Sequence, residues 1–441
     1  MTLAALWPRA AAERAALGAL LLAYLLLAAA FAALTPAWQN PDEPAHYNYT
    51  AQVARAGCCP VIEPGDWSSA YLDELKAARF APERLARLDT IQYEDHQPPL
   101  YYLLAAPVYQ LSGGSLLALR LFSALLGAGV VLCAYLVAKA MLPQRPAVAL
   151  GTAALVAFTP QHLALLAAAN NDALAGLLVG VGLLAMVLYV KGARLPAWAL
   201  GVLAGLLFIT KASGYPLAAL LLLAVVLRHR RGALPHVIAF LLPALALGAL
   251  WWLRNLGVYG FPDFLGLGAH DRVVVGQPRT ADAVAAVGLG QHLSSGLQTT
   301  FNSFWGQFGW MALPLQPWMY AIFQALTLAG LAGLVAGWLA LPRAAPPPGQ
   351  RQAWLLLALT LALALLAYGY YNTEFIQFQG RYLYPALIPF ALLLALGLDN
   401  LGRWLLPRCA PARWLAPALL ALLAPLNAYL IVFVIRPLLA P

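Results

Sequence analysis

Long apolar runs separated by short polar connections dominate the chain. A transmembrane helix needs about 20 predominantly apolar residues, so the pattern predicts an all-α polytopic membrane protein with about eleven transmembrane helices. The runs lie at about 15–35, 115–141, 146–168, 171–190, 195–212, 214–228, 234–255, 317–341, 352–371, 382–402 and 413–436.

Composition agrees with this pattern. The 441 residues are 62% hydrophobic and only 10% charged, and the mean hydropathy is +0.74. These values exclude a soluble globular domain of this length. Cys58 and Cys59 are adjacent, and the four cysteines show neither a disulfide framework nor zinc-binding spacing.

The placement of charge orients the predicted helices. If the N-terminus is cytoplasmic, basic residues such as Arg14, Lys139, Arg145 and Arg228 fall on the inner side, and most acidic residues fall on the outer side. Short loops rich in Lys and Arg stay in the cytoplasm. The net charge of +9 is therefore a topology signal, and no nucleic-acid partner is expected.

Two outer segments, 36–97 and 257–316, are much longer than the other loops. The first contains amphipathic stretches around 43–56 and 68–90, which are typical of juxtamembrane helices that lie on the membrane surface. A proline-rich linker at 345–350 suggests two parts. Residues 1–341 would form a transmembrane catalytic bundle that includes both outer segments, and residues 342–441 would form C-terminal transmembrane helices.

Unusual polar residues gather on the predicted outer side. Asp42 and Glu43 are adjacent acids directly after the first span, where ionised groups near hydrocarbon are costly and tend to be functional. We expect one of them to be a catalytic base. Adjacent helical residues point about 100° apart, so only one can face a substrate. The candidates for substrate binding are His46, His96, Tyr101, Asn171, Asp172, Lys211, Arg254, Arg381 and Tyr382.

Each of these residues also has a structural interpretation. Asp42 or Asp172 would serve as a helix N-cap, and Glu94 and Asp95 would be solvated loop residues. Lys211, Arg254 and Arg381 would extend to lipid headgroups, as basic residues at span ends often do. The gathering of all of them on one side favours a shared site.

Glycosyl transfer from a lipid-linked sugar requires this set of groups. A carboxylate would take the proton of the acceptor hydroxyl, an effect typically of ~10²–10⁴-fold. Lys211 or Arg381 would stabilise the charge that develops on the departing polyprenyl phosphate. In-line attack would invert the anomeric configuration.

Six motifs resemble the GT-C superfamily of integral-membrane glycosyltransferases, and in particular a bacterial multi-pass family with a PDEPAH signature. The similarity to protein O-mannosyltransferases and aminoarabinose transferases is more distant. The motifs are PDEPAHY at 41–47, HQPPLYYLL at 96–104, NND at 170–172, TK at 210–211, WWLRN at 251–255 and GRYLYP at 380–385.

The resemblance implies a GT-C-like bundle in the bacterial cytoplasmic membrane with an extracytoplasmic active site. The donor would be a polyprenyl-phosphate-linked sugar, and the acceptor a glycan, lipid or protein of the cell envelope. Asp42 matches the acidic motif of the superfamily. A second outer DxD-type metal motif is not evident, so metal-independent transfer without a cofactor is favoured, although Glu94, Asp95 and His96 leave a divalent metal open.

Other functions remain open at this stage. A transporter or lipid-linked glycan flippase would use the same charges along a substrate path, but would place ionisable groups at helix centres. A polysaccharide polymerase or ligase would use a large late outer loop, for which 257–316 is long enough. A non-catalytic assembly factor would keep the fold without the chemistry.

Overall fold

The computed structural model describes residues 6–8, 10–340, 347–407 and 414–441. Within these residues nearly all regular structure is helical, as predicted. The expected boundary between 1–341 and 342–441 lies outside the described residues.

Nine helical segments among the described residues are long and apolar enough to cross a membrane. The last of them is a composite of short helices. The segments are α2 (Ala11–Leu34), α6 (Leu116–Met141), α9 (Asp172–Val190), α11 (Tyr215–His229) with its flanking turns, α12 (Leu234–Tyr259), α16 (Pro317–Ala340), α17 (Pro348–Glu374), α18 (Leu387–Leu405), and the run α19 (Leu415–Ala421), α20 (Leu423–Tyr429), η6 (Leu430–Ile435) and α21 (Arg436–Leu439).

The other two predicted spans deviate from straight transmembrane helices. α7 (Pro146–Phe158) and α8 (Pro160–Leu166) bend by 65° because Pro160 lacks an amide hydrogen and forces Thr159 into an extended conformation. α10 (Ala197–Phe208) has only 12 residues, about 18 Å of helix. All eleven predicted runs are therefore helical, but nine or ten of them satisfy the criteria for a full span.

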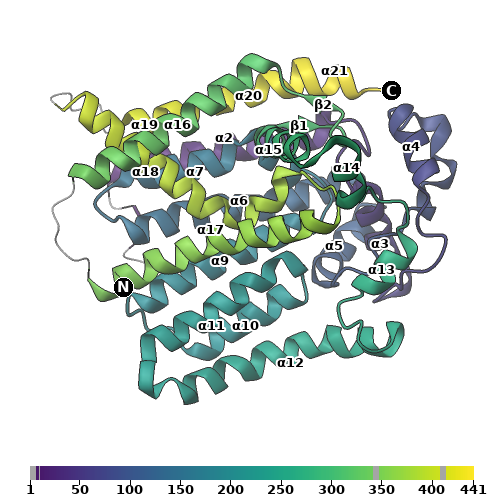
Figure 1. Ribbon diagram of the computed structural model, residues 1–441, viewed down its shortest axis with the longest axis horizontal. Coiled ribbons are helices and arrows are strands. Elements are labelled where there is room, and N and C mark those ends of the chain that lie inside the picture. Colours follow the sequence, from purple (N-terminus) through teal and green to yellow (C-terminus); the bar gives the residue numbers. More distant parts are fainter. Residues whose placement is uncertain (1–5, 9, 341–346, 408–413) are drawn as a thin grey trace.

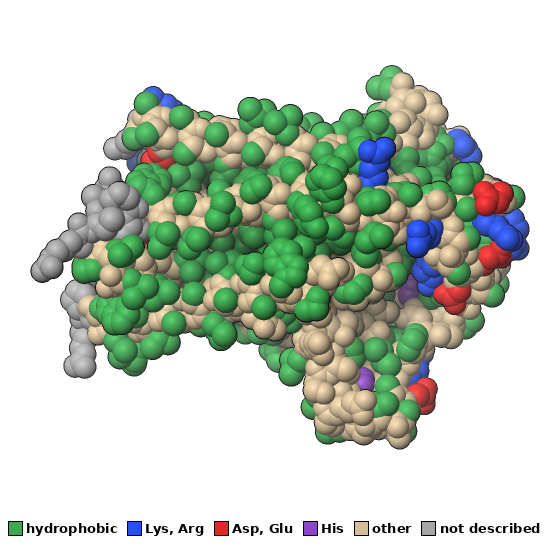
Figure 2. Space-filling model, turned by 90° about the horizontal axis from the view of Figure 1, so that it is seen from above, with side chains coloured by type: hydrophobic (Ala, Val, Ile, Leu, Met, Phe, Trp, Pro, Cys, Tyr) green, Lys and Arg blue, Asp and Glu red, His purple; other side chains and the backbone are tan. Residues whose placement is uncertain are grey.

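The protein core lies around α9. In the most apolar window of α9, 78% of the residues are buried, against 22% in α12. α12 packs on α10 at the edge of the bundle, and it exposes Leu242, Leu245, Leu250 and Leu253. Figure 2 shows a largely hydrophobic flank, with charged side chains gathered towards one end of the molecule. This distribution is typical of a helix bundle surrounded by lipid.

The two long connecting segments meet at one end of the bundle, opposite the N mark (Figure 1). The first forms α3 (Glu43–Ala56), α4 (Ser69–Ala77) and the 3-10 helix η1 (Pro82–Thr90). The predicted helices around 43–56 and 68–90 are therefore confirmed. α5 (Leu100–Leu111) then packs against α3 and α6.

The second long segment is also ordered into helices. It contains α13 (Leu267–Val273), α14 (Thr280–Val287) and α15 (Leu289–Trp305), followed by the two-residue strands β1 (Gln307–Phe308) and β2 (Leu313–Pro314). The strands pair antiparallel, with Gln307 opposite Pro314 and Phe308 opposite Leu313. α15 contacts η4 (Gly380–Ala386), the 3-10 helix before α18, and so links this segment to the candidate site.

Candidate active site

Asp42 lies where the loop after α2 turns into α3, between Pro41 and Pro44. Its φ angle of +65° falls in the left-handed region, which Asp tolerates better than most residues. Asp42 occupies the N-cap position, but its side chain makes no capping hydrogen bond. The capping interpretation of Asp42 is therefore wrong, and its carboxylate is free to face other elements.

Two residues from distant parts of the chain hold this carboxylate. The Tyr93 hydroxyl donates to Oδ1 at 2.8 Å, and Arg381 Nη2 donates to Oδ2 at 2.6 Å. Only 21% of the Asp42 side chain and 12% of the Arg381 side chain are exposed. The pair is therefore a short, charge-assisted contact that is largely shielded from water.

The pKa of Asp42 reflects opposing effects. Burial raises it, but the charges of Arg381 and His46 and the hydrogen bonds from Arg381 and Tyr93 lower it to about 2. Asp42 is thus ionised at neutral pH. Because the guanidinium is the largest opposing influence, any ligand that draws Arg381 away would make Asp42 a stronger base.

The GRYLYP motif forms η4 and places Arg381 by close packing against α15. A Cβ on Gly380 would come within 2.3 Å of the Phe304 amide nitrogen, so only glycine fits there. The Gly380 amide donates to Ser303 Oγ at 2.8 Å, and the Tyr384 hydroxyl donates to the Phe304 carbonyl at 2.7 Å. These contacts fix the backbone on both sides of Arg381.

A second ion pair lies beside the first. Lys211 Nζ donates to Asp172 Oδ1 at 2.7 Å and to Asn171 Oδ1 at 2.8 Å. α9, η4 and the short 3-10 helix η2 (Ala212–Gly214) after Lys211 contact one another in all three combinations. The charge of Arg381 also acts on Asp172. The structure therefore brings Asp42, Asp172, Lys211 and Arg381 into one region.

Glu43 has a different environment from its neighbour. It is fully buried and forms a bidentate pair with Arg120 of α6, with Nε–Oε1 at 2.8 Å and Nη2–Oε2 at 2.6 Å. The backbone amides of Trp38 and Ala169 also donate to it. Arg120 donates in addition to the carbonyls of residues 32, 35 and 36 at the end of α2. The Glu43–Arg120 pair therefore connects α2, α3 and α6.

His46 and Tyr101 have different hydrogen-bond partners. His46 Nδ1 shares a 2.8 Å hydrogen bond with the Tyr102 hydroxyl, and burial lowers the pKa of His46. The imidazole also experiences the charges of Lys211, Asp42 and Asp172, so His46 lies near both ion pairs. Tyr101 instead hydrogen-bonds Ser123 Oγ of α6 at 2.8 Å in the bundle core, away from them.

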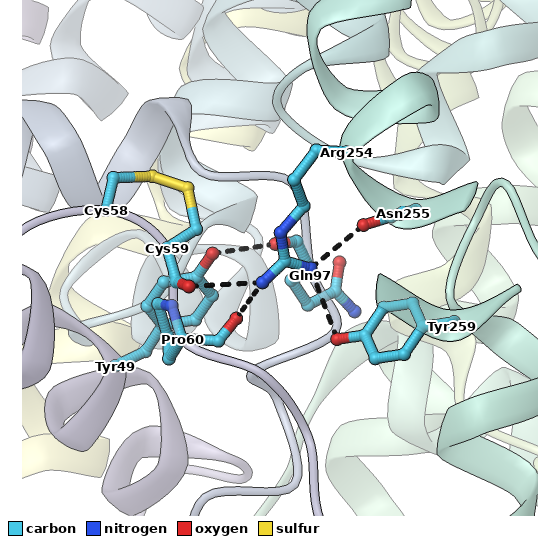
Figure 3. Close-up of a disulfide and its surroundings, with 8 residues drawn as sticks. All are labelled: Tyr49, Cys58, Cys59, Pro60, Gln97, Arg254, Asn255 and Tyr259. Atoms are coloured by element: carbon cyan, nitrogen blue, oxygen red, sulfur yellow. Dashed lines mark hydrogen bonds between the residues drawn. A yellow bond between two sulfur atoms is a disulfide. The ribbon is translucent and has the colours of Figure 1, made fainter. Parts of the chain in front are cut away.

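Arg254 holds the first outer segment rather than joining the ion pairs (Figure 3). It donates to the carbonyls of Cys59 and Pro60, to Asn255 Oδ1 at 3.0 Å and to the Tyr259 hydroxyl at 3.3 Å. Cys58 and Cys59 form a disulfide, which the sequence analysis did not predict. Arg254 therefore fastens this loop to α12.

His96 lies next to α13. Its ring centroid is 4.3 Å from that of His270, and Nδ1 donates to the Tyr93 carbonyl at 3.0 Å. Burial lowers the pKa of His96 to about 4, so this side chain is neutral at pH 7. Within the described residues no group of three or more His, Cys, Asp or Glu side chains is arranged to hold a metal ion.

An apolar groove lies between α11, α17 and η4. Its wall begins at Ala212 and Ser213, directly after Lys211, and ends at Tyr382 and Pro385, directly after Arg381. The rest of the lining comes from small and apolar residues of α11 and α17. Tyr382 thus joins the charged region to this groove.

Arg120 and Tyr93 were missed in the sequence analysis. Arg120 carried a usable signal, because an arginine inside an otherwise apolar span requires a buried acidic partner. Tyr93 carried none, since a tyrosine in a polar loop is unremarkable. Its role depends on the fold of residues 57–97.

Comparison with known proteins agrees with the motif analysis. Residues 96–252 match the family model of dolichyl-phosphate-mannose-protein mannosyltransferases. The predicted resemblance to GT-C membrane glycosyltransferases is confirmed. No curated protein matches the chain.

One similar solved structure is the crystal structure of ArnT from Cupriavidus metallidurans bound to undecaprenyl phosphate. It has 17% sequence identity and a TM-score of 0.49, and the match covers 91% of this chain. The chain spans 61% of the length of ArnT.

Proposed function

We propose that the protein transfers a sugar from a polyprenyl-phosphate carrier to a cell-envelope acceptor at the outer face of a bacterial cytoplasmic membrane. The observation that carries this proposal is that the ionised carboxylate of Asp42 pairs with Arg381 beside a second pair, Lys211 with Asp172, next to an apolar groove. The groove suits an isoprenoid chain, and the cations suit its phosphate.

Both cations have hydrogen-bonding capacity left for a phosphate. Arg381 Nε is buried without a partner, which is costly unless a ligand supplies an acceptor. Lys211 carries three ammonium hydrogens and donates to two acceptors, Asn171 and Asp172. A phosphate between Arg381 and Lys211 would accept hydrogen bonds from the unused donors of both side chains.

Asp42 would act as the base. It would take the proton from the acceptor hydroxyl while the resulting oxygen attacks the anomeric carbon. The bond between that carbon and the phosphate oxygen would break, and its electron pair would leave with the polyprenyl phosphate. Attack opposite the leaving group inverts the anomeric centre. As Arg381 turns towards the phosphate, its hold on Asp42 weakens and the basicity of Asp42 rises towards the range useful for proton transfer.

The other residues predicted from the sequence to bind substrate would have supporting roles around Asp42, Arg381 and Lys211. We propose that His46 and Asp172 orient the two charged groups, and that Asn171 positions Lys211. Glu43, Tyr101 and Arg254 would support the site from outside. The N-terminus would be cytoplasmic, which places α3, α4 and α13 on the outer side.

A transfer assay tests the proposed function. Purified protein in lipid vesicles is given polyprenyl phosphates that carry different radiolabelled sugars, together with cell-envelope extract as acceptor. We expect one donor class to lose its sugar to an acceptor and to leave polyprenyl phosphate behind. Movement of the intact glycolipid across the bilayer without loss of the sugar would instead indicate a flippase and would refute the proposal.

Neutralising either cation should weaken donor binding. For Arg381→Gln and Lys211→Gln we expect the KM for the donor to rise about 10- to 100-fold, since a hydrogen bond to a charged group contributes about 1.5–3 kcal/mol. The KM for the acceptor should change little. Steady-state kinetics with each substrate varied in turn measures this difference.

Arg84→Gln and Lys76→Gln are matched controls, because both residues lie on the same outer segment and pair at the surface with Glu74 and Asp73. Both controls should keep the wild-type donor KM. An unchanged donor KM in both Arg381→Gln and Lys211→Gln would show that these side chains do not bind the donor phosphate.

A further inference from the structure

Glu94 has a buried carboxylate oxygen without a hydrogen-bond partner. It directly follows Tyr93, whose hydroxyl holds Asp42, and its side chain was expected to be solvated. The residue is partly exposed, but its Oε2 is buried and accepts no hydrogen bond. No Lys or Arg of the described residues forms an ion pair with Glu94, whereas Asp42 and Asp172 each have one.

The surroundings of Glu94 place it in the candidate active site. Its charge acts on His46 of α3, which also experiences the charges of Asp42, Asp172 and Lys211. It acts as well on Tyr382 beside Arg381 and on His270 of α13. Glu94 therefore lies near His46, Tyr382 and His270, beside the candidate site.

The neighbours of Glu94 do not neutralise it. Burial lowers the pKa of His46 and of His270, which disfavours a positive charge on either imidazole. Arg381 and Lys211 are already paired with Asp42 and Asp172. A buried carboxylate oxygen without a donor is costly, and a ligand that brings hydrogen-bond donors would remove that cost.

The chemistry of the donor decides which part of it meets Glu94. The phosphate carries the same sign of charge and would be repelled, so it belongs with Arg381 and Lys211. The isoprenoid chain has no hydrogen-bond donors. The hydroxyl groups of the sugar do, and the two oxygens of a carboxylate accept from a pair of neighbouring hydroxyls.

We propose that Glu94 recognises the sugar of the lipid-linked donor by accepting hydrogen bonds from its hydroxyl groups. This inference rests on the proposed function. It divides the site into a cationic side for the phosphate and an acidic side for the sugar, with Asp42 between them. An acidic recognition group also disfavours sugars that carry a carboxylate of their own.

A binding experiment separates the two sides. Affinities are measured in detergent for polyprenyl phosphate and for polyprenyl phosphates carrying glucose, galactose, mannose, N-acetylglucosamine or glucuronic acid. The wild type should bind one neutral glycosyl lipid more tightly than polyprenyl phosphate. In Glu94→Gln we expect the affinity for that glycosyl lipid to fall about 10- to 100-fold, with the affinity for polyprenyl phosphate unchanged.

Two further variants complete the test. Glu83→Gln, on an exposed residue of η1, should behave like the wild type. Glu94→Asp keeps the charge but shortens the side chain, and it should lose part of the preference for the glycosyl lipid. Because Glu94→Gln removes a charge whose Oε2 is buried without a donor, its melting temperature should equal or exceed that of the wild type.

The outcomes distinguish this inference from the proposed function. Glu94→Gln could keep the wild-type preference for the glycosyl lipid, or it could lose affinity for both lipids equally. Either result would show that Glu94 does not recognise the sugar, and it would leave the proposed function unaffected. If the wild type binds every glycosyl lipid no better than polyprenyl phosphate, both the inference and the proposed function are overturned.

Discussion

An Asp42→Asn variant is expected to lose sugar transfer by about 100- to 10,000-fold, the range over which a positioned base contributes. The amide is isosteric: its oxygen can still accept from Arg381, and its NH2 group can donate to the Tyr93 hydroxyl. The variant should therefore fold and bind the donor. What it lacks is the negative charge that takes the acceptor proton. The turnover rate with saturating donor and acceptor measures the effect.

Asp89→Asn is the matched control, because Asp89 is exposed on the same outer segment. It should retain wild-type turnover. Wild-type turnover in Asp42→Asn would exclude Asp42 as the base. A loss of donor binding that fully accounts for the lower rate would show instead that Asp42 acts only by orienting Arg381.

The second large effect is on stability. Arg120→Met should lower the free energy of unfolding by about 3–5 kcal/mol, because removal of one partner leaves a buried charge uncompensated. Glu43 would lose its bidentate contact, and the carbonyls at the end of α2 would lose three hydrogen bonds. Unfolding of the detergent-solubilised protein by denaturant, followed by tryptophan fluorescence, measures the change.

The double variant Glu43→Met/Arg120→Met provides the control for this pair. With both charges gone, it should be less destabilised than the sum of the two single variants, which shows that the residues act on each other. A stable and fully folded Arg120→Met protein would contradict the structural role of the pair. A stable Glu43→Gln variant with abolished transfer would reopen Glu43 as the base.

Most of the bundle was predictable because apolar length is a local property of the sequence. The hydropathy pattern located every span, and the alternation of charged and apolar residues located α3 and α4. The hydropathy pattern could not distinguish the bent pair at Pro160 or the short α10 from straight transmembrane helices, because apolar composition does not determine the direction of a helix. Orientation within the membrane stays a prediction from the placement of Lys and Arg.

The site was predictable by residue type but not by partner. Sequence reasoning selected both Asp42 and Arg381, yet their contact joins positions 339 residues apart and depends on α15 packing against Gly380. It could not choose between Asp42 and Glu43, because the choice depends on the left-handed turn at Asp42 and on Arg120. It also selected Arg254, whose hydrogen bonds go to loop carbonyls instead.

The most direct measurement is an experimental structure with a bound polyprenyl-phosphonate sugar, an analogue whose anomeric bond cannot break. We predict phosphonate oxygens about 2.7–3.2 Å from side-chain nitrogens of Arg381 and Lys211. The lipid chain should lie in the groove between α11 and α17, and the anomeric carbon should face the Asp42 carboxylate. A phosphonate bound elsewhere, with Asp42 turned away from the sugar, would contradict this prediction.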